Sequence, residues 1–156
     1  KNKILKKENF YFLLNISAIF FLDRYSKIIV MKDFSDKSVY INNFLNFDLV
    51  WNTGIGFGLF SSNSSIVYNS ISAIIALVII GLLIFAFKAD KFDKIIFALI
   101  IGGAVGNFYD RVLLNAVPDF IDVHFKEFHW FTFNLADIFI TIGIICFIIK
   151  DLLVKN

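Results

Sequence analysis

Charged residues are scarce in this chain. Only 18% of its 156 residues are Asp, Glu, Lys or Arg, and 58% are hydrophobic, whereas soluble domains are about 25% charged and about 45–50% apolar. This composition argues against a soluble enzyme, a nucleic-acid-binding protein and a disordered chain. The formal net charge of +2 is small, so it implies no general field for binding anions.

The chain also has only one cysteine and one proline, and it lacks the common motifs of soluble enzymes. The single cysteine, Cys146, cannot form an internal disulfide, and because it lies in an apolar run we interpret it as a core or lipid-facing residue. The sequence contains no His-Glu-x-x-His motif, no nucleotide-binding loop and no dinucleotide fingerprint. It also lacks a nucleophile elbow, long repeats and low-complexity linkers. A chain of this length predicts one domain.

Long uncharged stretches are what the sequence has instead. Stretches of about 20 apolar residues are candidates for membrane spans, and four segments qualify or nearly do, at about residues 10–31, 66–87, 95–114 and 133–153. The first is not a signal peptide, because it lacks a small-residue cleavage site and charges follow its apolar part. The sequence therefore predicts a mostly α membrane protein, a four-transmembrane-helix bundle in a single integral membrane domain over residues 1–156.

Lysines are concentrated at one end of these segments. They precede the first segment, fill the short link between the second and third, and follow the fourth, whereas residues 32–65 and 115–132 are poorer in Lys and Arg. Cytoplasmic loops carry the excess of Lys and Arg. Both termini are therefore expected in the cytoplasm, with residues 32–65 and 115–132 forming extracytoplasmic loops.

The first of these outer loops has a strand pattern. Apolar and polar residues alternate between Leu45 and Trp51, which is the period of a half-buried strand, and Val39 and Ile41 are candidates for a partner strand. Residues 52–58 then contain three glycines, which suits a tight turn or a close backbone approach. We expect a small β-sheet, or cradle, at the outer membrane surface.

Ionisable residues interrupt three of the four predicted spans. A charge at the centre of a membrane helix costs roughly 2.5–3.5 kcal/mol or more, so such residues are by default functional or paired. At 1.5 Å per residue, three of the aspartates lie roughly 20 to 23 Å from the cytoplasmic side, in one layer of a core about 30 Å thick. A shared polar site explains this common depth. The interrupting residues are Asp23, Arg24, Lys27, Asp110, Arg111 and Asp137.

The same charges also have a structural interpretation. Asp23 and Lys27, four residues apart, can pair along one helix face. With Asp110 and Arg111 they could form a lattice of ion pairs that only holds helices together. This interpretation is weaker for Asp137, because no basic residue lies within one turn of it in the sequence.

The third segment combines small and polar residues. Gly102 and Gly106 have the small-xxx-small spacing that is typical of close helix packing, and packing is the interpretation we favour. Asn107 and Asp110, three residues apart, share a face of the same predicted helix. The glycines would let another helix or a ligand approach that face.

The connection before the fourth segment holds three acids and two histidines. Residues 117–122 fit an extended segment with alternating faces. A metal site is an option, since His and carboxylate suit zinc or iron, but the spacing matches no familiar ligand motif. We interpret Asp122 and Glu127 as solvated loop acids. The acids are Asp119, Asp122 and Glu127, and the histidines are His124 and His129.

A pair of aspartates is the chemistry that best fits these residues. Two carboxyl groups within a few ångström cannot both ionise easily, so the pair holds one proton. The ionised member can draw a proton from a water that attacks a carbonyl, and the protonated member can then donate. The best candidates are Asp119 and Asp137; Asp23 is weaker because Lys27 could keep it ionised. This is aspartic peptidase chemistry, with neither metal nor covalent intermediate.

Two other functions use similar residues. Acids within spans also form ion relays, so an ion or proton-coupled membrane transporter is the main alternative. A relay should continue toward the cytoplasm, however, and the inner halves of these spans carry acids only near their ends. A membrane metalloenzyme is the third option, and activity that resists chelators would exclude it.

Five short motifs occur in order along nearly the whole chain. They are Asp23-Arg-Tyr-Ser-Lys27, Asn52-Thr-Gly54-Ile-Gly-Phe-Gly58, Gly102-Gly-Ala-Val-Gly-Asn107-Phe-Tyr-Asp110-Arg111, Val117-Pro-Asp119-Phe and Phe133-Asn134-Leu-Ala-Asp137. Because it carries these five motifs in this order, the chain resembles the bacterial lipoprotein signal peptidase family, also called signal peptidase II. One departure is Gly56, where the family usually has Ala, and it affects only the expected packing of that loop.

The resemblance implies a site and a location. It implies that Asp119 and Asp137 are the catalytic aspartates of a membrane aspartic endopeptidase that needs no metal and no cofactor. It places the enzyme in the bacterial cytoplasmic (inner) membrane, with the active site near the extracytoplasmic face. The substrate-binding and supporting positions that match the family are Asp23, Lys27, Asn52, Gly54, Gly103, Asn107, Asp110, Arg111 and Asn134.

The resemblance also implies a substrate, a prolipoprotein whose cysteine already carries diacylglycerol and which is cut before that cysteine. Membrane phospholipid is expected to surround the protein, and nucleic acid is not an expected partner. Non-helical substrate backbone at membrane depth needs polar protein partners; Asn52, Asn107, Arg111 and Asn134 could supply them. The predicted strand and the glycine-rich loop, with Trp51 and Phe57, could close over the substrate as a clamp.

Overall fold

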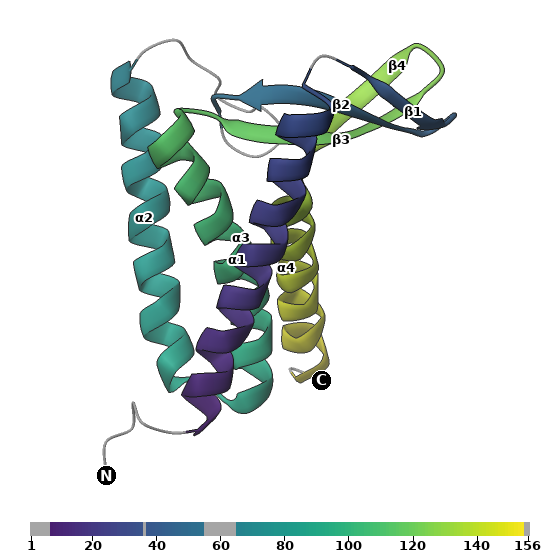
Figure 1. The fold of residues 1–156 in the computed structure, drawn as a ribbon. Coiled ribbons are helices and arrows are strands. Elements are labelled where there is room, and N and C mark those ends of the chain that lie inside the picture. The colour runs from purple at the N-terminus through teal and green to yellow at the C-terminus, as the bar shows by residue number, and fades with distance from the viewer. Residues whose placement is uncertain (1–6, 36, 55–64, 155–156) are drawn as a thin grey trace.

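The computed structural model describes residues 7–35, 37–54 and 65–154. Within these residues, four long helices stand beside one another, and an antiparallel four-stranded sheet lies across one end of them (Figure 1). The helices are α1 (Lys7–Asp33), α2 (Ser65–Lys88), α3 (Lys91–Leu114) and α4 (Leu135–Val154), and the strands are β1 (Val39–Asn42), β2 (Leu45–Asn52), β3 (Val117–Phe125) and β4 (Phe128–Phe133). The predicted mostly helical architecture with a small sheet is confirmed.

The helices match the predicted segments closely, with one correction. The fourth segment was predicted to begin at residue 133, but Phe133 is the last residue of β4 and pairs with Ile121 of β3, so α4 begins at Leu135. By length and composition, two helices of the described chain, Ile66–Lys88 and Lys91–Leu114, are apolar enough to cross a membrane. The arrangement with four spans stays a prediction.

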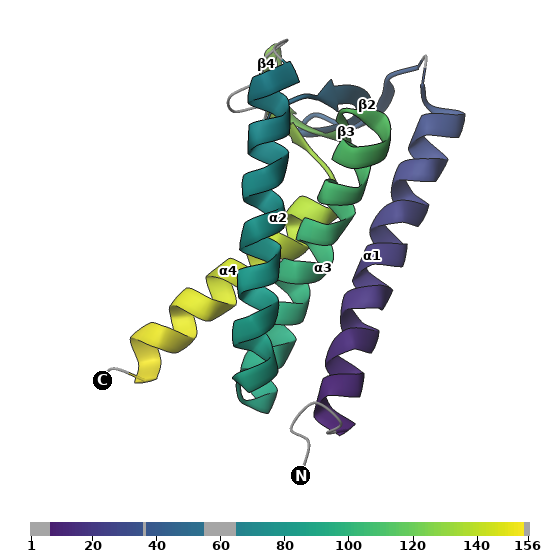
Figure 2. The same cartoon turned by 90° about the vertical axis from the view of Figure 1, so that its left-hand side faces the viewer.

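Helix α3 packs against each of the other three helices. A Cβ atom on Gly102 would lie 2.8 Å from the Ile19 side chain of α1, and one on Gly103 would lie 2.5 Å from the carbonyl oxygen of Ala136 in α4. Glycine at these positions therefore allows α1 and α4 to approach the backbone of α3 closely. A Cβ atom on Gly106 would lie 2.5 Å from the Asp23 carboxylate of α1, so the close packing predicted for Gly102 and Gly106 is confirmed. Figure 2 shows α4 leaning away from the other helices toward its C-terminal end.

The sheet has the order β1-β2-β3-β4, and all neighbours are antiparallel. Strand β2 is the strand predicted between Leu45 and Trp51, and β1 is its predicted partner. The expected extended segment at residues 117–122 is part of β3, which forms a hairpin with β4. The glycine-rich loop beyond Gly54, including Gly56, Phe57 and Gly58, lies outside the described residues.

The chain passes from α3 into β3 over only two residues. Asn115 ends α3 with a left-handed backbone conformation at φ 57°, the conformation that commonly terminates a helix. Strand β3 begins at Val117 and pairs with Asn52 of β2. This short connection places Asp119 only five residues after the end of α3 at Leu114.

Candidate active site

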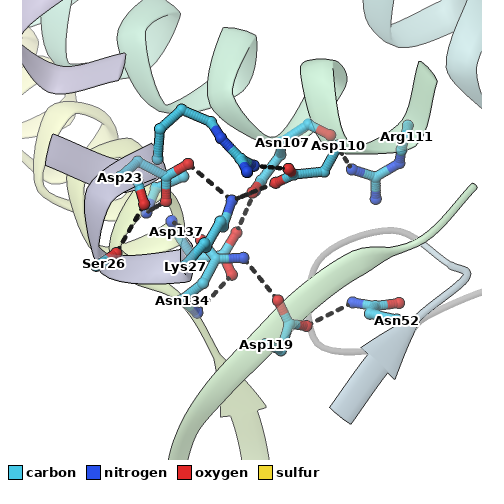
Figure 3. Close-up of polar contacts among 12 residues, drawn as sticks. Asp23, Ser26, Lys27, Asn52, Asn107, Asp110, Arg111, Asp119, Asn134 and Asp137 are labelled. Atoms are coloured by element: carbon cyan, nitrogen blue, oxygen red, sulfur yellow. Dashed lines mark hydrogen bonds and ion pairs between the residues drawn. The ribbon is translucent and has the colours of Figure 1, made fainter. Parts of the chain in front are cut away.

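Buried polar side chains gather where α1, α3 and α4 meet β2 and β3 (Figure 3). They include every polar residue that the sequence assigned to the site, and none of them is more than 9% exposed. The backbone positions Gly54 and Gly103 are buried beside them. The polar members are Asp23, Lys27, Asn52, Asn107, Asp110, Arg111, Asp119, Asn134 and Asp137.

Lys27 is the centre of the charged part of this cluster. Its ammonium group donates to the carboxylates of Asp23, at 2.8 Å, and Asp110, at 2.7 Å, and to the amide oxygen of Asn107 at 2.8 Å. A lysine ammonium has three donors, so all three are used. The predicted pair of Asp23 and Lys27 along α1 is confirmed, and so is the shared face of Asn107 and Asp110.

The two arginines bind partners far away in the sequence. Arg24 of α1 forms an ion pair with Asp110 of α3 and lies over the ring of Tyr109. Arg111 donates to the backbone carbonyl oxygen of Gly54, in the loop after β2. Arg24 therefore joins two helices, and Arg111 joins α3 to the sheet. Arg24 is one of the charges that interrupt the predicted spans, but it is not among the predicted site residues.

Asn134 and Asp137 cap the start of α4 reciprocally. The backbone N–H of Asp137 donates to the Asn134 side-chain oxygen at 3.1 Å, and the backbone N–H of Asn134 donates to the Asp137 carboxylate at 3.1 Å. This is the geometry of a capping box, in which two otherwise unpaired donors of a helix end are satisfied. The box holds the Asp137 carboxylate in one orientation at the start of α4.

The same helix start is attached to α1 and α3. The backbone N–H of Ala136 donates to the Asp23 carboxylate at 3.0 Å, and the amide nitrogen of Asn107 donates to the other oxygen of Asp137 at 2.8 Å. Asp23 thus positions α4 in addition to pairing with Lys27. Both oxygens of Asp137 accept hydrogen bonds.

Asp119 is held from two sides by amide groups. Asn134 donates to one carboxylate oxygen at 2.6 Å, and Asn52 donates to the other at 2.8 Å. The Asn52 oxygen in turn accepts from the Gly54 backbone N–H at 2.8 Å, which fixes the orientation of its amide. Asn134 therefore contacts both Asp119 and Asp137, and it joins the two predicted catalytic carboxyl groups in one hydrogen-bonded unit.

The pKa of Asp119 is raised from 3.8 to about 6, first because burial disfavours the charged carboxylate and next because the negative charge of Asp137 repels it. The hydrogen bonds from Asn52 and Asn134 act in the opposite direction. A carboxyl group in this environment can hold a proton close to neutral pH. Beside an ionised partner, it can act as a general acid while the partner acts as a general base.

Comparison with known proteins agrees with this geometry. Residues 15–153 match the sequence model of the family described as signal peptidase (SPase) II. The chain belongs to the signal peptidase II family. It is an enzyme, a membrane aspartic endopeptidase, and the transporter alternative finds no support.

Similar proteins cover almost the whole chain. A lipoprotein signal peptidase of Pelagibacter ubique is 49% identical over 99% of this chain and 95% of its own length. Another, from Thermodesulfovibrio yellowstonii, is 41% identical over 89% of this chain and 92% of its own length. A solved bacterial membrane enzyme is 30% identical, with a TM-score of 0.79, and covers 94% of this chain and 90% of its own.

One sequence interpretation near the site was wrong. The sequence predicts that Asp122 is a solvated loop acid, but it lies within β3 and is 3% exposed, with its carboxylate 2.7 Å from Nδ1 of His129. The pairing of β3 with β4 creates this contact, and loop spacing alone could not predict it. Glu127, at the turn of the hairpin, is exposed as expected.

Proposed function

We propose that this chain removes signal peptides from diacylglyceryl-modified prolipoproteins by cutting before the lipidated cysteine, with Asp119 and Asp137 as the catalytic pair. The observation that supports the pair best is the double contact of Asn134, which binds both carboxyl groups. One aspartate would take a proton from the attacking water, and the other would protonate the leaving amine. The remaining polar residues would position this pair and the unwound substrate backbone.

An apolar groove beside Asp137 suits a membrane-embedded substrate. It has a volume of about 270 Å³ and opens along the start of α4. Its wall combines Asp137 with side chains that can contact hydrocarbon. We infer that apolar parts of the substrate lie here while the scissile bond faces the carboxyl groups. The other residues of the wall are Phe131, Phe133, Ile138, Thr141 and Ile142.

We further propose that all four helices span the bacterial cytoplasmic membrane, with the sheet outside. Helices α1 and α4 expose large apolar side chains along their outward faces, among them Phe21 at 67% and Leu152 at 59%. Water disfavours such faces and lipid tails accept them. Three charged residues in the outer half of α1, Asp23, Arg24 and Lys27, contact α3 and α4 instead, through ion pairs and a hydrogen bond. The start of α1 and the end of α4 lie at the end of the helices remote from the sheet (Figure 1), which agrees with two cytoplasmic termini.

Mass spectrometry of the cleavage products tests the substrate and the position of the cut. The purified protein in liposomes would be given a prolipoprotein whose cysteine carries diacylglycerol, and in parallel the same protein without lipid. We expect release of a signal peptide that ends just before the cysteine, from the lipidated form only. Cleavage at another bond, or equal cleavage of the form without lipid, would contradict the proposal.

A further inference from the structure

A second cluster of chemically reactive side chains lies on the sheet. Asp122 and His124 are two residues apart on β3, so they share one face of the strand, and His129 on β4 pairs directly with His124. One possible ligand atom from each of the three lies within 4.8 Å of the others. The pairing of β3 with β4 therefore brings a carboxylate and two imidazoles together, although their sequence spacing matches no metal motif.

The two distances from Asp122 to the histidines are close to those of a metal site. The Asp122 carboxylate oxygen lies 3.6 Å from Nδ1 of His124 and 2.7 Å from Nδ1 of His129. Zinc bonds of about 2.0–2.1 Å place two ligand atoms of a tetrahedral site roughly 3.3 Å apart. The distance from Asp122 to His124 is near that value. A shift of the His129 side chain by well under about 1 Å would bring the distance from Asp122 to His129 to the same value.

His124 gives an independent indication of a ligand. Its side chain is 6% exposed, and its Nδ1 atom has no hydrogen-bond partner within the described part of the chain. A buried ring nitrogen without a partner is unfavourable. This nitrogen faces the Asp122 carboxylate, and a metal ion bound between the two would satisfy both.

The cluster is also held firmly and open to solvent on one side. The backbone N–H of His124 donates to the carbonyl oxygen of Phe44 at 3.0 Å, next to the start of β2, so the middle of the cluster is fixed by the sheet. The His129 side chain is 54% exposed. An ion could therefore enter past His129 and keep a water molecule as its fourth ligand, as zinc sites with three protein ligands do.

We propose that Asp122, His124 and His129 bind a divalent transition-metal ion, with Zn²⁺ as the best match because imidazole and carboxylate are ligands that it accepts readily. The ion ties β3 to β4 and stabilises the hairpin. Side chains alternate along β3, so Asp119 points to the opposite face of the strand. The metal therefore takes no part in peptide hydrolysis, and the site does not depend on the proposed catalytic pair.

Zinc titration of the purified, tag-free full-length protein in detergent micelles tests this site. Affinity would be measured by competition with a coloured zinc chelator, and Co²⁺ would be added in a parallel sample to detect tetrahedral coordination by its visible absorption. We expect one equivalent of Zn²⁺ to bind, and His129→Gln to weaken binding at least roughly tenfold. Glu127→Gln, an exposed change in the same hairpin, and Asp119→Asn should leave the affinity unchanged.

His129 carries the test because its side chain is half-exposed, whereas a change at buried His124 could prevent folding. Circular dichroism would confirm that each variant keeps its helix content. Absence of saturable Zn²⁺ binding by the wild-type protein would overturn the proposal, as would equal affinity in His129→Gln. Loss of binding in Asp119→Asn would place the ion at the catalytic pair and would overturn it too. The readout is zinc affinity, so these outcomes are separate from any failure of the proposed peptidase function.

Discussion

Removal of the Asp119 charge should change how the stability of the protein depends on pH. Burial and the charge of Asp137 raise the pKa of Asp119 from 3.8 in the unfolded chain to about 6 in the folded protein. The folded state therefore binds more protons than the unfolded state between these values, and the free energy of unfolding falls as the pH rises. The destabilisation is absent below about pH 4 and complete above about pH 6.

The size of this effect follows from the shift in pKa. A difference of about two units, at about 1.4 kcal/mol per unit, corresponds to about 3 kcal/mol. Asp119 is only 2% exposed, so solvent screening reduces this figure little. Asn cannot ionise, so this pH-dependent destabilisation is absent from Asp119→Asn. The unfolding free energy of the variant, relative to that of the wild type, should therefore rise by about 3 kcal/mol between pH 4 and pH 7.

Reversible unfolding in mixed detergent micelles, followed by circular dichroism at several pH values, measures this change. The slope with pH is the quantity to compare, because Asn also alters the hydrogen bonds from Asn52 and Asn134 and so shifts stability at every pH. Asp48→Asn, an exposed change on β2, should leave the wild-type slope unchanged. Parallel pH curves for wild type and Asp119→Asn would refute the reasoning.

Three further substitutions test how the site is held. Gly103→Ala should lower the free energy of unfolding by about 1–3 kcal/mol and reduce processing, because the new Cβ atom meets the carbonyl oxygen of Ala136. Gly81→Ala is the matched control, because Gly81 has open space around it. Equal stability and processing of the two variants would contradict this prediction. Lys27→Met should destabilise the protein by about 3–5 kcal/mol, since it removes the ammonium group from two buried carboxylates and leaves Asp23 without its ion-pair partner, while Asp110 keeps Arg24; a melting temperature like that of the wild type would contradict this. Trp51→Ala should raise KM and leave kcat nearly unchanged if the end of β2 closes over the substrate, and an unchanged KM would count against the clamp.

Much of the fold was predictable because helices and strands leave local periodic patterns. The uncharged runs predicted all four helices, and the alternation from Leu45 to Trp51 predicted β2. The start of α4 carries a local signal as well, since Asn134 and Asp137 have the spacing of a capping box before an apolar run. The apolar run alone predicts a start at residue 133, whereas the capping-box spacing indicates the observed start at Leu135.

Contacts between distant segments could not be predicted in the same way. The link between Asp119 and Asn134 joins a strand to a helix end, and Arg24 meets Asp110 across 86 residues of sequence. Side-chain spacing within one element carries no information about the distance between two elements. For the same reason the sequence does not predict that Asp122 is buried, since only the register of β3 with β4 brings His129 close to it.

The catalytic pair is tested most directly by single-turnover processing of a lipidated prolipoprotein, followed by its mobility shift on a gel. The wild-type protein would be compared with Asp119→Asn, Asp137→Asn and the control Asp48→Asn, each confirmed to be folded. Loss of a general acid or base costs about 10²–10⁴-fold in rate. The processing rate of both site variants should therefore fall by at least about 10²-fold, while the control keeps the wild-type rate. Processing by either site variant at a rate near that of the wild type would contradict the assignment of Asp119 and Asp137.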